Sequence, residues 1–478
     1  MTVSLSLNRR RRFHRAMSER DTRIQAFVDP GLGNSSYLVA APDRGVAAVI
    51  DPQRDVDQYL AAAKVLGVAI AQVIDTHLHA DFVSGARELA SQAGAGIAAS
   101  AGAQLRFDHR PLRDGERLDV GGIEFRVLET PGHSPEHISL VLTAGGKPGA
   151  LFSGGALMVG GAARTDLLGE ADSVPLARKL YHTLQKIMTL PDEVQLLPTH
   201  GAGSFCAAPV SKDRTSTIGR ERASNPLAQP MSEVEFVRRA LSGLPSYPVY
   251  FSEMRSVNQV GPKVFQGLPQ PPSWDAIRLR SWADGGGAVV DVRSAQEFAE
   301  GHVPGAYSIG TDVWVETWAG WLIPFGTPLA LVADTAADLE DAVRQLFRIG
   351  YDDLQGQLAG GMAAWRAAGF PEEKVRSVTA TELRRLLDTP EAPTVLDVRF
   401  DREWRRGHIP GAVHVENGDL ARGDLPFPPE RTVAVHCATG GRSMTGISVL
   451  ARRGYRNLLQ VSDGITGWQA AGLEVRKE

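Results

Sequence analysis

The C-terminal part of the chain contains an internal repeat, which constrains the fold more than any single motif because both copies must fold alike. The run Val-Val-Asp-Val-Arg at residues 289–293 recurs as Val-Leu-Asp-Val-Arg at residues 395–399. The run Gly-His-Val-Pro-Gly-Ala at 301–306 recurs as Gly-His-Ile-Pro-Gly-Ala at 407–412. A third pair, in which a glycine precedes a tryptophan by four residues, lies later in each copy. We therefore expect two homologous α/β domains in tandem.

The length of the chain suggests further domains before the repeat. At 478 residues the chain is too long for a single hydrophobic core, and a repeat unit of about 100 residues is long enough to fold alone. The segment before the repeat begins with periodic apolar runs and ends in a stretch rich in Ser, Asn, Pro and Gly. The predicted division is a disordered tail at residues 1–22, an α/β domain at 23–209, a connector at 210–272, and the two repeated domains at 273–375 and 376–478.

Short β-branched runs alternate with Gly-rich turns and Ala-rich stretches in the first of these domains, a pattern typical of a layered α/β fold. We predict strands at residues 36–39, 47–51, 72–75 and 124–128, helices at 57–66 and 85–93, and one further helix at 232–241 within the connector. The predicted fold class is therefore multidomain α/β.

Composition argues against several classes of protein. The net charge of −4 gives no support for nucleic acid or an anionic membrane as a partner. No apolar run reaches the roughly 18 residues of a membrane span, and polar residues rather than a secretory h-region follow the basic run at 9–12. The only two cysteines, Cys206 and Cys437, exclude a disulfide framework and favour a reactive thiol in a reducing compartment. We expect a cytoplasmic protein, and a homo-oligomer is possible.

The second repeat copy has a cysteine at the end of a predicted strand. The strand at 432–436 runs into Cys437, and a Gly-containing loop then leads into a helix through Leu450. Backbone N–H groups and the helix dipole stabilise negative charge at such a position and lower a thiol pKa. Arg442 adds a cation. Cys437 is therefore a candidate nucleophile that holds a thiolate, a persulfide or an oxyanion; the alternative is a buried, inert cysteine.

The repeated motifs resemble the rhodanese family, and the resemblance implies sulfur transfer through a persulfide on Cys437. In the first copy Asp334 occupies the place of the cysteine and no Arg-Ser pair follows it. A carboxylate cannot carry a sulfane sulfur, so we expect this copy to be catalytically silent and to act as a scaffold or docking surface. In the second copy the candidate catalytic residues are Cys437, Arg442 and Ser443, and the candidate substrate-binding loop is Ala438, Thr439, Gly440 and Gly441.

Histidines of the first domain lie on loops that follow predicted strands. His77 and His79 stand in Asp-Thr-His-Leu-His-Ala-Asp, His133 in Thr-Pro-Gly-His, and His200 in Pro-Thr-His-Gly. Widely separated histidines on Gly- or Pro-marked loops fit a metal site assembled at one edge of an α/β sandwich. A lone histidine is usually a surface or core residue, whereas this combined pattern indicates metal binding.

The histidine pattern resembles the metallo-β-lactamase superfamily and, within it, the persulfide dioxygenase branch, which includes forms fused to rhodanese domains. The resemblance implies an αββα sandwich and one Fe(2+) held by His77, His133 and an Asp. Two positions depart from the pattern. Phe82 replaces the last His of the first motif, which favours a mononuclear site, and Gly155 stands where the ligand Asp would be.

Without that carboxylate, the set of two histidines and one carboxylate is incomplete. His79 would complete a three-His set with His77 and His133. Alternatively, Asp166 or Asp81 would substitute for the missing carboxylate, or the metal is weakly bound or absent. The sequence does not rank these alternatives.

Two further residues complete the candidate site. His200 is a candidate metal ligand. Cys206, six residues beyond it, is a candidate sulfur acceptor near the metal, or else a small buried apolar side chain.

Together, the two resemblances imply detoxification of sulfide or sulfane sulfur. The metal domain would oxidise a low-molecular-weight persulfide with O2 to sulfite, and Cys437 would pass sulfane sulfur to sulfite, which gives thiosulfate, or to another thiol. The expected partners are therefore small molecules: a persulfide, sulfite or thiosulfate. The alternatives are a sulfurtransferase with a non-catalytic metallo-β-lactamase-fold scaffold, and a glyoxalase-II-like thioester hydrolase that would use Zn(2+).

Overall fold

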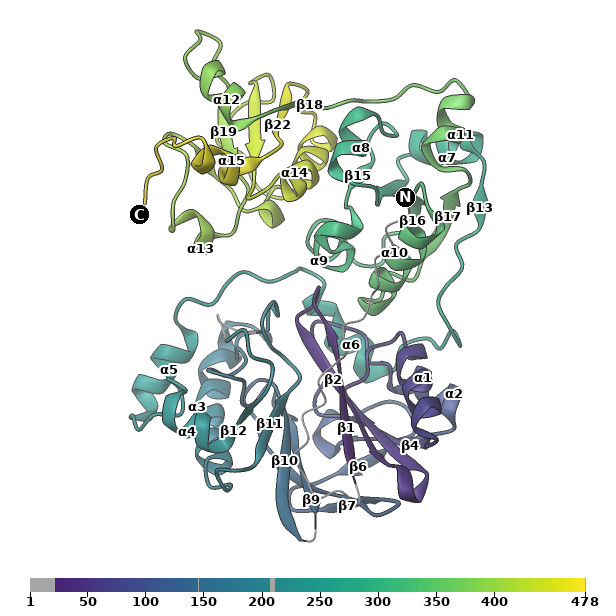
Figure 1. Cartoon of the computed structure of the whole chain (residues 1–478), viewed down its shortest axis with the longest axis vertical. Coiled ribbons are helices and arrows are strands. Elements are labelled where there is room, and N and C mark those ends of the chain that lie inside the picture. The colour runs from purple at the N-terminus through teal and green to yellow at the C-terminus, as the bar shows by residue number, and fades with distance from the viewer. Residues whose placement is uncertain (1–21, 145, 207–210, 478) are drawn as a thin grey trace, which may run out of the picture.

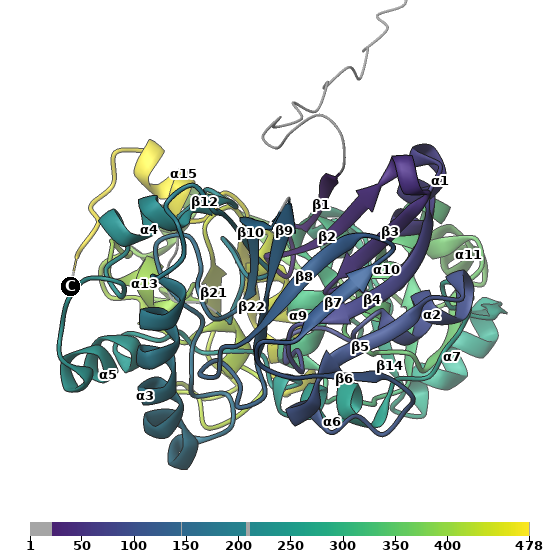
Figure 2. The same ribbon diagram turned by 90° about the horizontal axis from the view of Figure 1, so that it is seen from below.

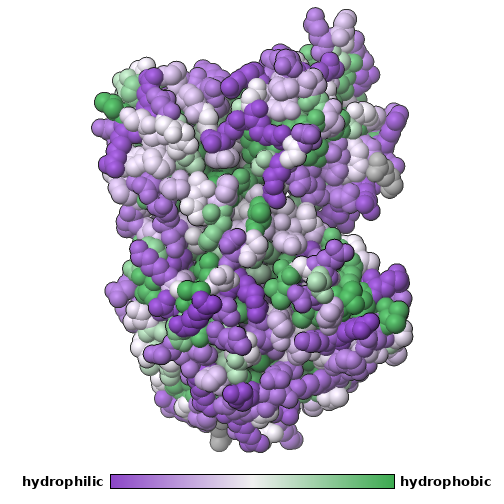
Figure 3. Space-filling view, turned by 180° about the vertical axis from the view of Figure 1, so that it is seen from behind, coloured by the Kyte–Doolittle hydropathy of each residue, from purple (hydrophilic) through white to green (hydrophobic). Residues whose placement is uncertain are grey.

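The computed structural model describes residues 22–144, 146–206 and 211–477. The predicted disordered tail lies outside these residues, except for its last residue. In Figure 1 the N-terminal domain forms the lower half of the molecule, and the two repeated domains lie side by side above it. Seen from behind, the outline narrows between the two halves, and hydrophilic residues cover most of this face (Figure 3).

The N-terminal domain contains two six-stranded sheets that pack face to face (Figure 2). The apolar core between them draws residues such as Tyr37, Phe125 and Phe152 from both sheets. The first sheet has the order β1 (Arg23–Asp29), β2 (Asn34–Ala41), β3 (Val46–Ile50), β4 (Ala69–Asp75), β5 (Gly96–Ser100), β6 (Arg110–Leu112). The second has the order β12 (Ser216–Thr217), β11 (Gln195–Pro198), β10 (Lys147–Gly154), β9 (Ile138–Ala144), β8 (Ile123–Glu129), β7 (Arg117–Val120).

Helices cover the outer faces of both sheets, which gives the expected αββα layers. Helices α1 (Asp57–Leu66) and α2 (Ala86–Ala93) pack on the first sheet through a cluster that includes Tyr59 and Leu89. Helix α3 (Glu170–Ile187) packs on the second sheet. The strands predicted at 36–39, 47–51, 72–75 and 124–128 and the helices predicted at 57–66 and 85–93 are confirmed.

The stretch between residues 211 and 272 is more ordered than a connector. Strand β12 pairs with β11, so the second sheet continues into this stretch. Its helices are α4 (Ile218–Ser224), α5 (Glu233–Leu241), which is the predicted helix, and α6 (Phe251–Val260). Helix α6 lies between the sandwich and the first repeated domain (Figure 1), and Met254 and Phe251 join the apolar cluster of the repeated domains.

The two repeated domains have the same topology, with five parallel strands in equivalent order. The first sheet has the order β13 (Ser273–Trp274), β17 (Leu354–Leu358), β16 (Leu329–Val332), β14 (Ala288–Asp291), β15 (Tyr307–Ser308). The second has the order β18 (Arg376–Val378), β22 (Leu458–Val461), β21 (Val433–His436), β19 (Thr394–Asp397), β20 (Val413–His414). Their helices are α7 (Ala276–Asp284), α8 (Ala295–Glu300), α9 (Val315–Leu322), α10 (Ala336–Arg348) and α11 (Gly361–Ala367), then α12 (Ala380–Leu386), α13 (Asp401–Trp404), α14 (Gly441–Arg452) and α15 (Gly464–Ala470).

The repeated sequence motifs have a structural explanation. In the second copy, Arg399 donates to Asp397 at the end of β19 and to the backbone oxygen of Gly407, 2.9 Å away. His408 then stacks on Trp404, with ring centroids 3.6 Å apart. The first copy repeats both interactions through Asp291, Arg293, Gly301, Phe298 and His302. The motif therefore closes the turn after the strand in each copy, independently of any cysteine.

The first repeated domain is joined to the sandwich by buried ion pairs. Arg348 at the end of α10 contacts Asp29, at 2.9 Å, and Asp55, at 2.8 Å. Arg54 of the sandwich in turn pairs with Asp352, at 2.6 Å. Among the described residues, no helix has both the length and the apolar character needed to cross a lipid bilayer.

Candidate metal centre and sulfur-transfer site

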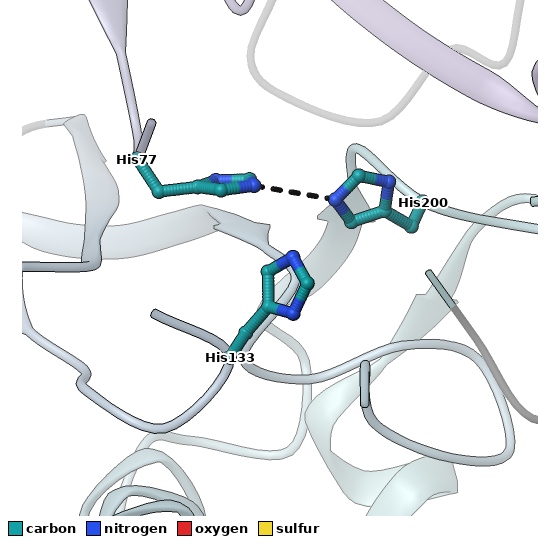
Figure 4. A group of neighbouring side chains, drawn as sticks. All are labelled: His77, His133 and His200. Carbon is teal, nitrogen blue, oxygen red and sulfur yellow. Dashed lines mark hydrogen bonds between the residues drawn. The ribbon is translucent and has the colours of Figure 1, made fainter. Parts of the chain in front are cut away.

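Three histidines converge at one edge of the sandwich (Figure 4). His77 follows β4 of the first sheet, while His133 and His200 follow β8 and β11 of the second. One nitrogen from each ring lies within 4.8 Å of the other two, and the Nε2 atoms of His77 and His200 are 3.3 Å apart. All three side chains are buried. The trio therefore forms a compact set of nitrogen donors drawn from both sheets.

The other nitrogen of each ring is held by a hydrogen bond. When Nδ1 donates, the lone pair of Nε2 is directed to the centre of the trio, the arrangement typical of metal-ligating histidines. The sequence does not indicate Arg164 or Asn34 as acceptors of these hydrogen bonds, because the contacts form only when distant loops meet. The acceptors are the backbone oxygen of Arg164 for His133 (2.7 Å), Asn34 Oδ1 for His200 (3.1 Å) and Thr76 Oγ1 for His77 (2.9 Å).

A buried carboxylate, Asp51, fixes the strand ends that carry the trio. It accepts from the backbone N–H of Thr76 at 2.7 Å, from Thr76 Oγ1 at 2.8 Å and from Thr199 Oγ1. Burial disfavours its charged form, but His79 and these hydrogen bonds hold the pKa of Asp51 below its usual value. The signal in the sequence for this role is a carboxylate at the end of β3, the strand that pairs with the strand before His77.

Two of the three imidazoles, those of His77 and His133, have a lowered pKa. Burial lowers the pKa of His133 to about 3, with His200 adding to the effect. Burial, followed by the neighbouring imidazoles, also lowers the pKa of His77 well below its usual value. Neutral imidazole is the form that coordinates a cation.

The space beside Gly155 is filled, although the absence of the expected Asp ligand predicts a gap there. A Cβ at residue 155 would lie 2.6 Å from Cδ2 of His133 and 3.0 Å from Cβ of Ala163. The ring of His133 thus fills the space in which the resemblance implies a carboxylate. The backbone N–H of Gly155 meanwhile donates to Nε2 of His137, at 2.9 Å.

The group of three histidines contains His200, whereas the alternative set of His77, His79 and His133 is not among the groups found in the described residues. His79 lies 3.3 Å from Asp51 and stacks on Phe82, with ring centroids 4.2 Å apart. Among the described residues, neither nitrogen of His79 has a hydrogen-bond partner, and Oδ1 of Asp81 has none either. Buried polar atoms without a hydrogen-bond partner, such as Nδ1 of His79 and Oδ1 of Asp81, fit a place at which a bound cation would be ligated. Two further groups could also hold a metal ion, His77 with Asp51 and His79, and His200 with His79 and Asp81.

Asp166 does not join these groups. Both its oxygens accept from Arg164, at 2.6 and 2.7 Å, and no potential metal-binding group among the described residues includes it. Its carboxylate therefore neutralises a buried arginine, which leaves it unsuited to the role of substitute ligand.

Cys206 lies in an apolar environment. It is fully buried in a cluster with Phe82 and Tyr250. Burial, and then the charge of Asp81, raise the pKa of its thiol well above the usual value. A thiol that resists ionisation is a poor sulfur acceptor, so the structure fits the alternative of a small buried side chain.

Cys437 stands at the tip of strand β21, where a tight loop turns into α14. The backbone N–H of Gly440 donates to its Sγ, at 3.1 Å. Ser443 does not contact the sulfur in this arrangement, because its hydroxyl donates to the backbone oxygen of Gly440, at 2.7 Å. The thiol is only 1% exposed, yet it lines a cavity. The loop therefore presents the sulfur to a pocket and not to a sealed core.

Arg442 is paired more strongly than the sequence suggested. Its guanidinium donates to both oxygens of Glu403, at 2.7 and 2.8 Å. Burial acts against its charge, but Glu403 raises the pKa of Arg442 above its usual value. Arg442 remains a cation beside the loop, with much of its charge balanced by that carboxylate.

The equivalent loop of the first copy is shorter. Helix α10 begins at Ala336, two residues after Asp334, whereas α14 begins four residues after Cys437. Asp334 accepts from the backbone N–H of Met362, at 2.9 Å, and its other oxygen lies 3.5 Å from Arg293. This geometry has neither the thiol nor the curled loop, in line with a silent copy.

Cys437 opens into a cavity of about 1190 Å³ that is shared by all parts of the chain. Its walls come from the sandwich, the connector and both repeated domains, which face one another where α9 and α13 lie above the sandwich (Figure 1). The sandwich contributes the segment that directly follows His200. The main wall segments are residues 30–31, 201–205, 243–246 and 312–318, with Phe400, Cys437 and Arg442 from the second copy.

Comparison with known families identifies these domains. The metallo-beta-lactamase superfamily matches residues 29–200, and the rhodanese-like domain family matches residues 275–368 and 379–471. The chain belongs to the metallo-β-lactamase superfamily and carries two rhodanese-like domains. The structural parallel extends beyond the first domain. Metallo-beta-lactamase from Staphylococcus aureus subsp. aureus COL has a TM-score of 0.64 and 31% identity over 71% of this chain and 99% of that chain.

Similar sequences within the superfamily carry two different activities. Human mitochondrial persulfide dioxygenase ETHE1 is 30% identical over 156 residues, which are 32% of this chain and 57% of that protein. Hydroxyacylglutathione hydrolase of Rhodopseudomonas palustris (strain HaA2) is 31% identical over 227 residues, which are 47% of this chain and 81% of that protein. The chain thus spans little more than half of the human relative. Sulfur metabolism is supported by the first relative together with the rhodanese-like domains.

Proposed function

We propose that this chain oxidises a low-molecular-weight persulfide with O2 to sulfite at the three-histidine site and transfers sulfane sulfur through Cys437. The observation that carries the proposal is the shared cavity, in which Cys437 and the segment that follows His200 form parts of one wall. The similarity to a persulfide dioxygenase supports the oxidation, and the Gly440 hydrogen bond to the sulfur supports the transfer.

The oxidation has a simple balance: RSSH, O2 and H2O give RSH, sulfite and two protons. His77, His133 and His200 would hold one cation, for which Fe(2+) is our proposal because imidazole donors suit iron. When bound, such a redox-active metal supplies the electrons that activate O2. The protein's own contribution is to fix the three imidazoles through Thr76, Asn34 and the Arg164 carbonyl.

The transfer uses the thiolate of Cys437. The thiolate attacks the terminal sulfur of RSSH, the S–S bond breaks, and RSH leaves with the proton while Cys437 retains a persulfide anion. Sulfite then attacks the outer sulfur, which releases thiosulfate and regenerates the thiolate. The N–H of Gly440 stabilises the anion at the sulfur, and the cation of Arg442 lies beside the loop.

Metal analysis with oxygen uptake tests the oxidation. We expect the protein as isolated to contain iron and to consume O2 when glutathione persulfide is added. Removal of the iron by a chelator should stop the uptake, and Fe(2+) should restore it. Iron-free protein that consumes no O2 even after reconstitution would overturn this half of the proposal and leave a sulfurtransferase on a non-catalytic scaffold.

Substitution of the thiol tests the transfer. Cys437→Ser should abolish thiosulfate:cyanide sulfurtransferase activity, because a hydroxyl cannot carry sulfane sulfur. During persulfide oxidation the same variant should accumulate sulfite in place of thiosulfate, as measured by ion chromatography. Cys206→Ser removes the other thiol and should retain thiosulfate:cyanide activity, since Cys206 is buried and is not among the residues that line the cavity. Unchanged turnover of Cys437→Ser would refute the assignment.

Thioester hydrolysis is a second candidate, because a hydroxyacylglutathione hydrolase is 31% identical over 81% of its own length. This activity would use a water activated by zinc, commonly between two metals. Phe82 stacks on His79 where the family motif has a further histidine, which acts against a second metal. Zinc in the isolated protein, together with hydrolysis of S-lactoylglutathione, would favour this candidate.

A further inference from the structure

Trp314 of the silent rhodanese copy has a strained backbone. It lies between the 3-10 turn Thr311–Val313 and helix α9, with φ of 68° and ψ of 96°. A positive φ is costly for a bulky side chain. The neighbouring hydrogen bonds hold it, since the N–H of Val315 donates to Gln345 Oε1 at 2.6 Å and the N–H of Val313 to the Gly310 oxygen at 3.1 Å. Such strain is typical of residues held in place for a ligand or a contact.

Trp314 and its neighbour Val313 also contact two other domains. A Cβ at Gly31 of the sandwich would lie 3.1 Å from the Trp314 ring, so the ring lies against that loop. The preceding residue, Val313, would be 2.6 Å from a Cβ at Gly441, where α14 begins. This short segment of the silent copy therefore contacts the sandwich on one side and the Cys437 loop on the other.

The ring of Trp314 has an open face. Its side chain is 40% exposed, one of the few large apolar side chains to be so, and it lines the cavity that contains Cys437. Arg402 of α13 and Arg405, which directly follows this helix, also line the cavity. Arg405 pairs with Asp401 at 2.9 Å, while the guanidinium of Arg402 lies 5.8 Å from the Phe400 ring. An open aromatic face in the wall of a cavity suits an organic molecule that stacks on the ring, and the charged residues of that wall include acidic as well as basic side chains.

We propose that Trp314 is a specificity-determining residue for Cys437, and that the silent copy supplies the wall that binds the organic part of the persulfide donor. The inference rests on the proposed sulfur transfer and names its substrate class: an organic persulfide whose body packs on the ring, as opposed to an inorganic donor. Thiosulfate has no organic body to stack on Trp314, so it depends on the Cys437 loop alone.

The backbone at residue 314 provides a clean experiment. Trp314→Gly removes the ring and relieves the positive φ, so the variant should fold without loss of thermal stability. Sulfur transfer from glutathione persulfide and from thiosulfate, each to cyanide, gives two values of kcat/KM. We expect the ratio of the first to the second to fall about tenfold relative to the unsubstituted protein, as for loss of one good aromatic contact.

A matched control exists at Gln266, a second non-glycine residue with positive φ (61°), which is exposed and does not line the cavity. Gln266→Gly should leave the donor ratio unchanged. If Trp314→Gly folds poorly, Trp314→Asn serves as the second variant, because Asn tolerates a positive φ. The inference is overturned if either folded variant keeps the donor ratio of the unsubstituted protein. This includes the case in which kcat/KM falls by the same factor with both donors. Failure of the proposed function is distinct: it would appear as sulfur transfer that survives Cys437→Ser.

Discussion

Residue 155 controls the space in which the imidazoles meet. With no side chain at Gly155, the ring of His133 occupies that space and lies with its centroid 5.2 Å from that of His200. The Arg164 carbonyl holds the ring there through Nδ1. If the trio holds the metal, as proposed, the donor set is three nitrogens and not the mixed nitrogen and oxygen set that the resemblance implies.

Gly155→Ala is expected to weaken metal binding. The added methyl would lie 2.6 Å from the His133 ring and 3.0 Å from Ala163, so the ring must shift away from the trio. We expect metal affinity to fall at least about tenfold, as for disturbed support of a ligand, measured by elemental analysis and competition with a chelator. In Gly155→Asp the added Cβ would collide with the His133 ring in the same way. This variant should therefore not restore the set of two histidines and one carboxylate that the resemblance implies.

Gly96→Ala is the control for this substitution, since its methyl would meet only the flexible end of Gln72, at 3.3 Å. Its metal content should equal that of the unsubstituted protein. Full metal affinity in Gly155→Ala would mean that His133 is not a ligand.

No side of helix α9 faces the solvent, because all eight of its residues are buried. It contains Glu316, whose two carboxylate oxygens lack a hydrogen-bond partner in any other described residue. A Cβ at Gly31 would collide with this carboxylate, so the side chain points at the sandwich. Burial, and then the charge of Asp29, raise the pKa of Glu316 to about 8.

This pKa predicts a pH dependence of stability. Between the usual value of 4.5 and about 8, the folded protein binds a proton that the unfolded chain has lost, so the free energy of unfolding falls as the pH rises through this window and levels off above it. Glu316→Gln should remove this slope and be the more stable protein at pH 9, by several kcal/mol at about 1.4 kcal/mol per pKa unit. Thermal unfolding at pH 5, 7 and 9 checks this, with the exposed Glu253→Gln as control. Parallel curves for Glu316→Gln and the unsubstituted protein would contradict it.

Helices and strands with a strong hydrophobic period were predictable from the sequence. Elements whose burial or pairing depends on distant parts of the chain were not. The helix expected at 57–66 is α1, because its apolar spacing reflects packing on one sheet. Helix α6 was missed because its buried polar residue, Asn258, donates to the backbone oxygens of His79 and Phe82 in a distant loop. Two-residue strands such as β15 were also missed, since only pairing with β14 defines them.

The same distinction applies to the candidate site. Spacing and loop position indicated His77, His133 and His200 as ligand candidates, because glycine and proline mark the loops at the sheet edge. Spacing could not choose between His79 and His200 as the third member, since side-chain direction on a loop depends on packing. In the structure, Phe82 holds His79 by stacking while Asn34 orients His200.

At the scale of the whole molecule, aromatic rings from three domains meet beside the cavity. Phe205 of the sandwich contacts Trp321 of the silent copy and Phe400 of the active copy, with centroids 5.7 and 5.9 Å apart. Trp318 stacks with Phe400 at 6.1 Å. Phe205 lies on the segment that follows His200, and Phe400 lies beneath Arg442. The silent copy therefore fixes how the Cys437 loop faces the metal domain.

A substitution at the domain boundary tests whether this fixed orientation matters for turnover. Gly418 of the active copy packs so closely on Trp321 that an added Cβ would collide with the indole ring. Gly418→Ala should displace the active copy, at a cost of about 1–3 kcal/mol in stability, without altering a residue of either candidate site. On the proposed function, sulfite formed at the three-histidine site would have to reach the Cys437 persulfide, so a displaced loop should let more of it escape. We expect a higher ratio of sulfite to thiosulfate during persulfide oxidation, with thiosulfate:cyanide activity retained. The same product ratio as in the Gly96→Ala control would mean that the transfer does not depend on how the domains are seated.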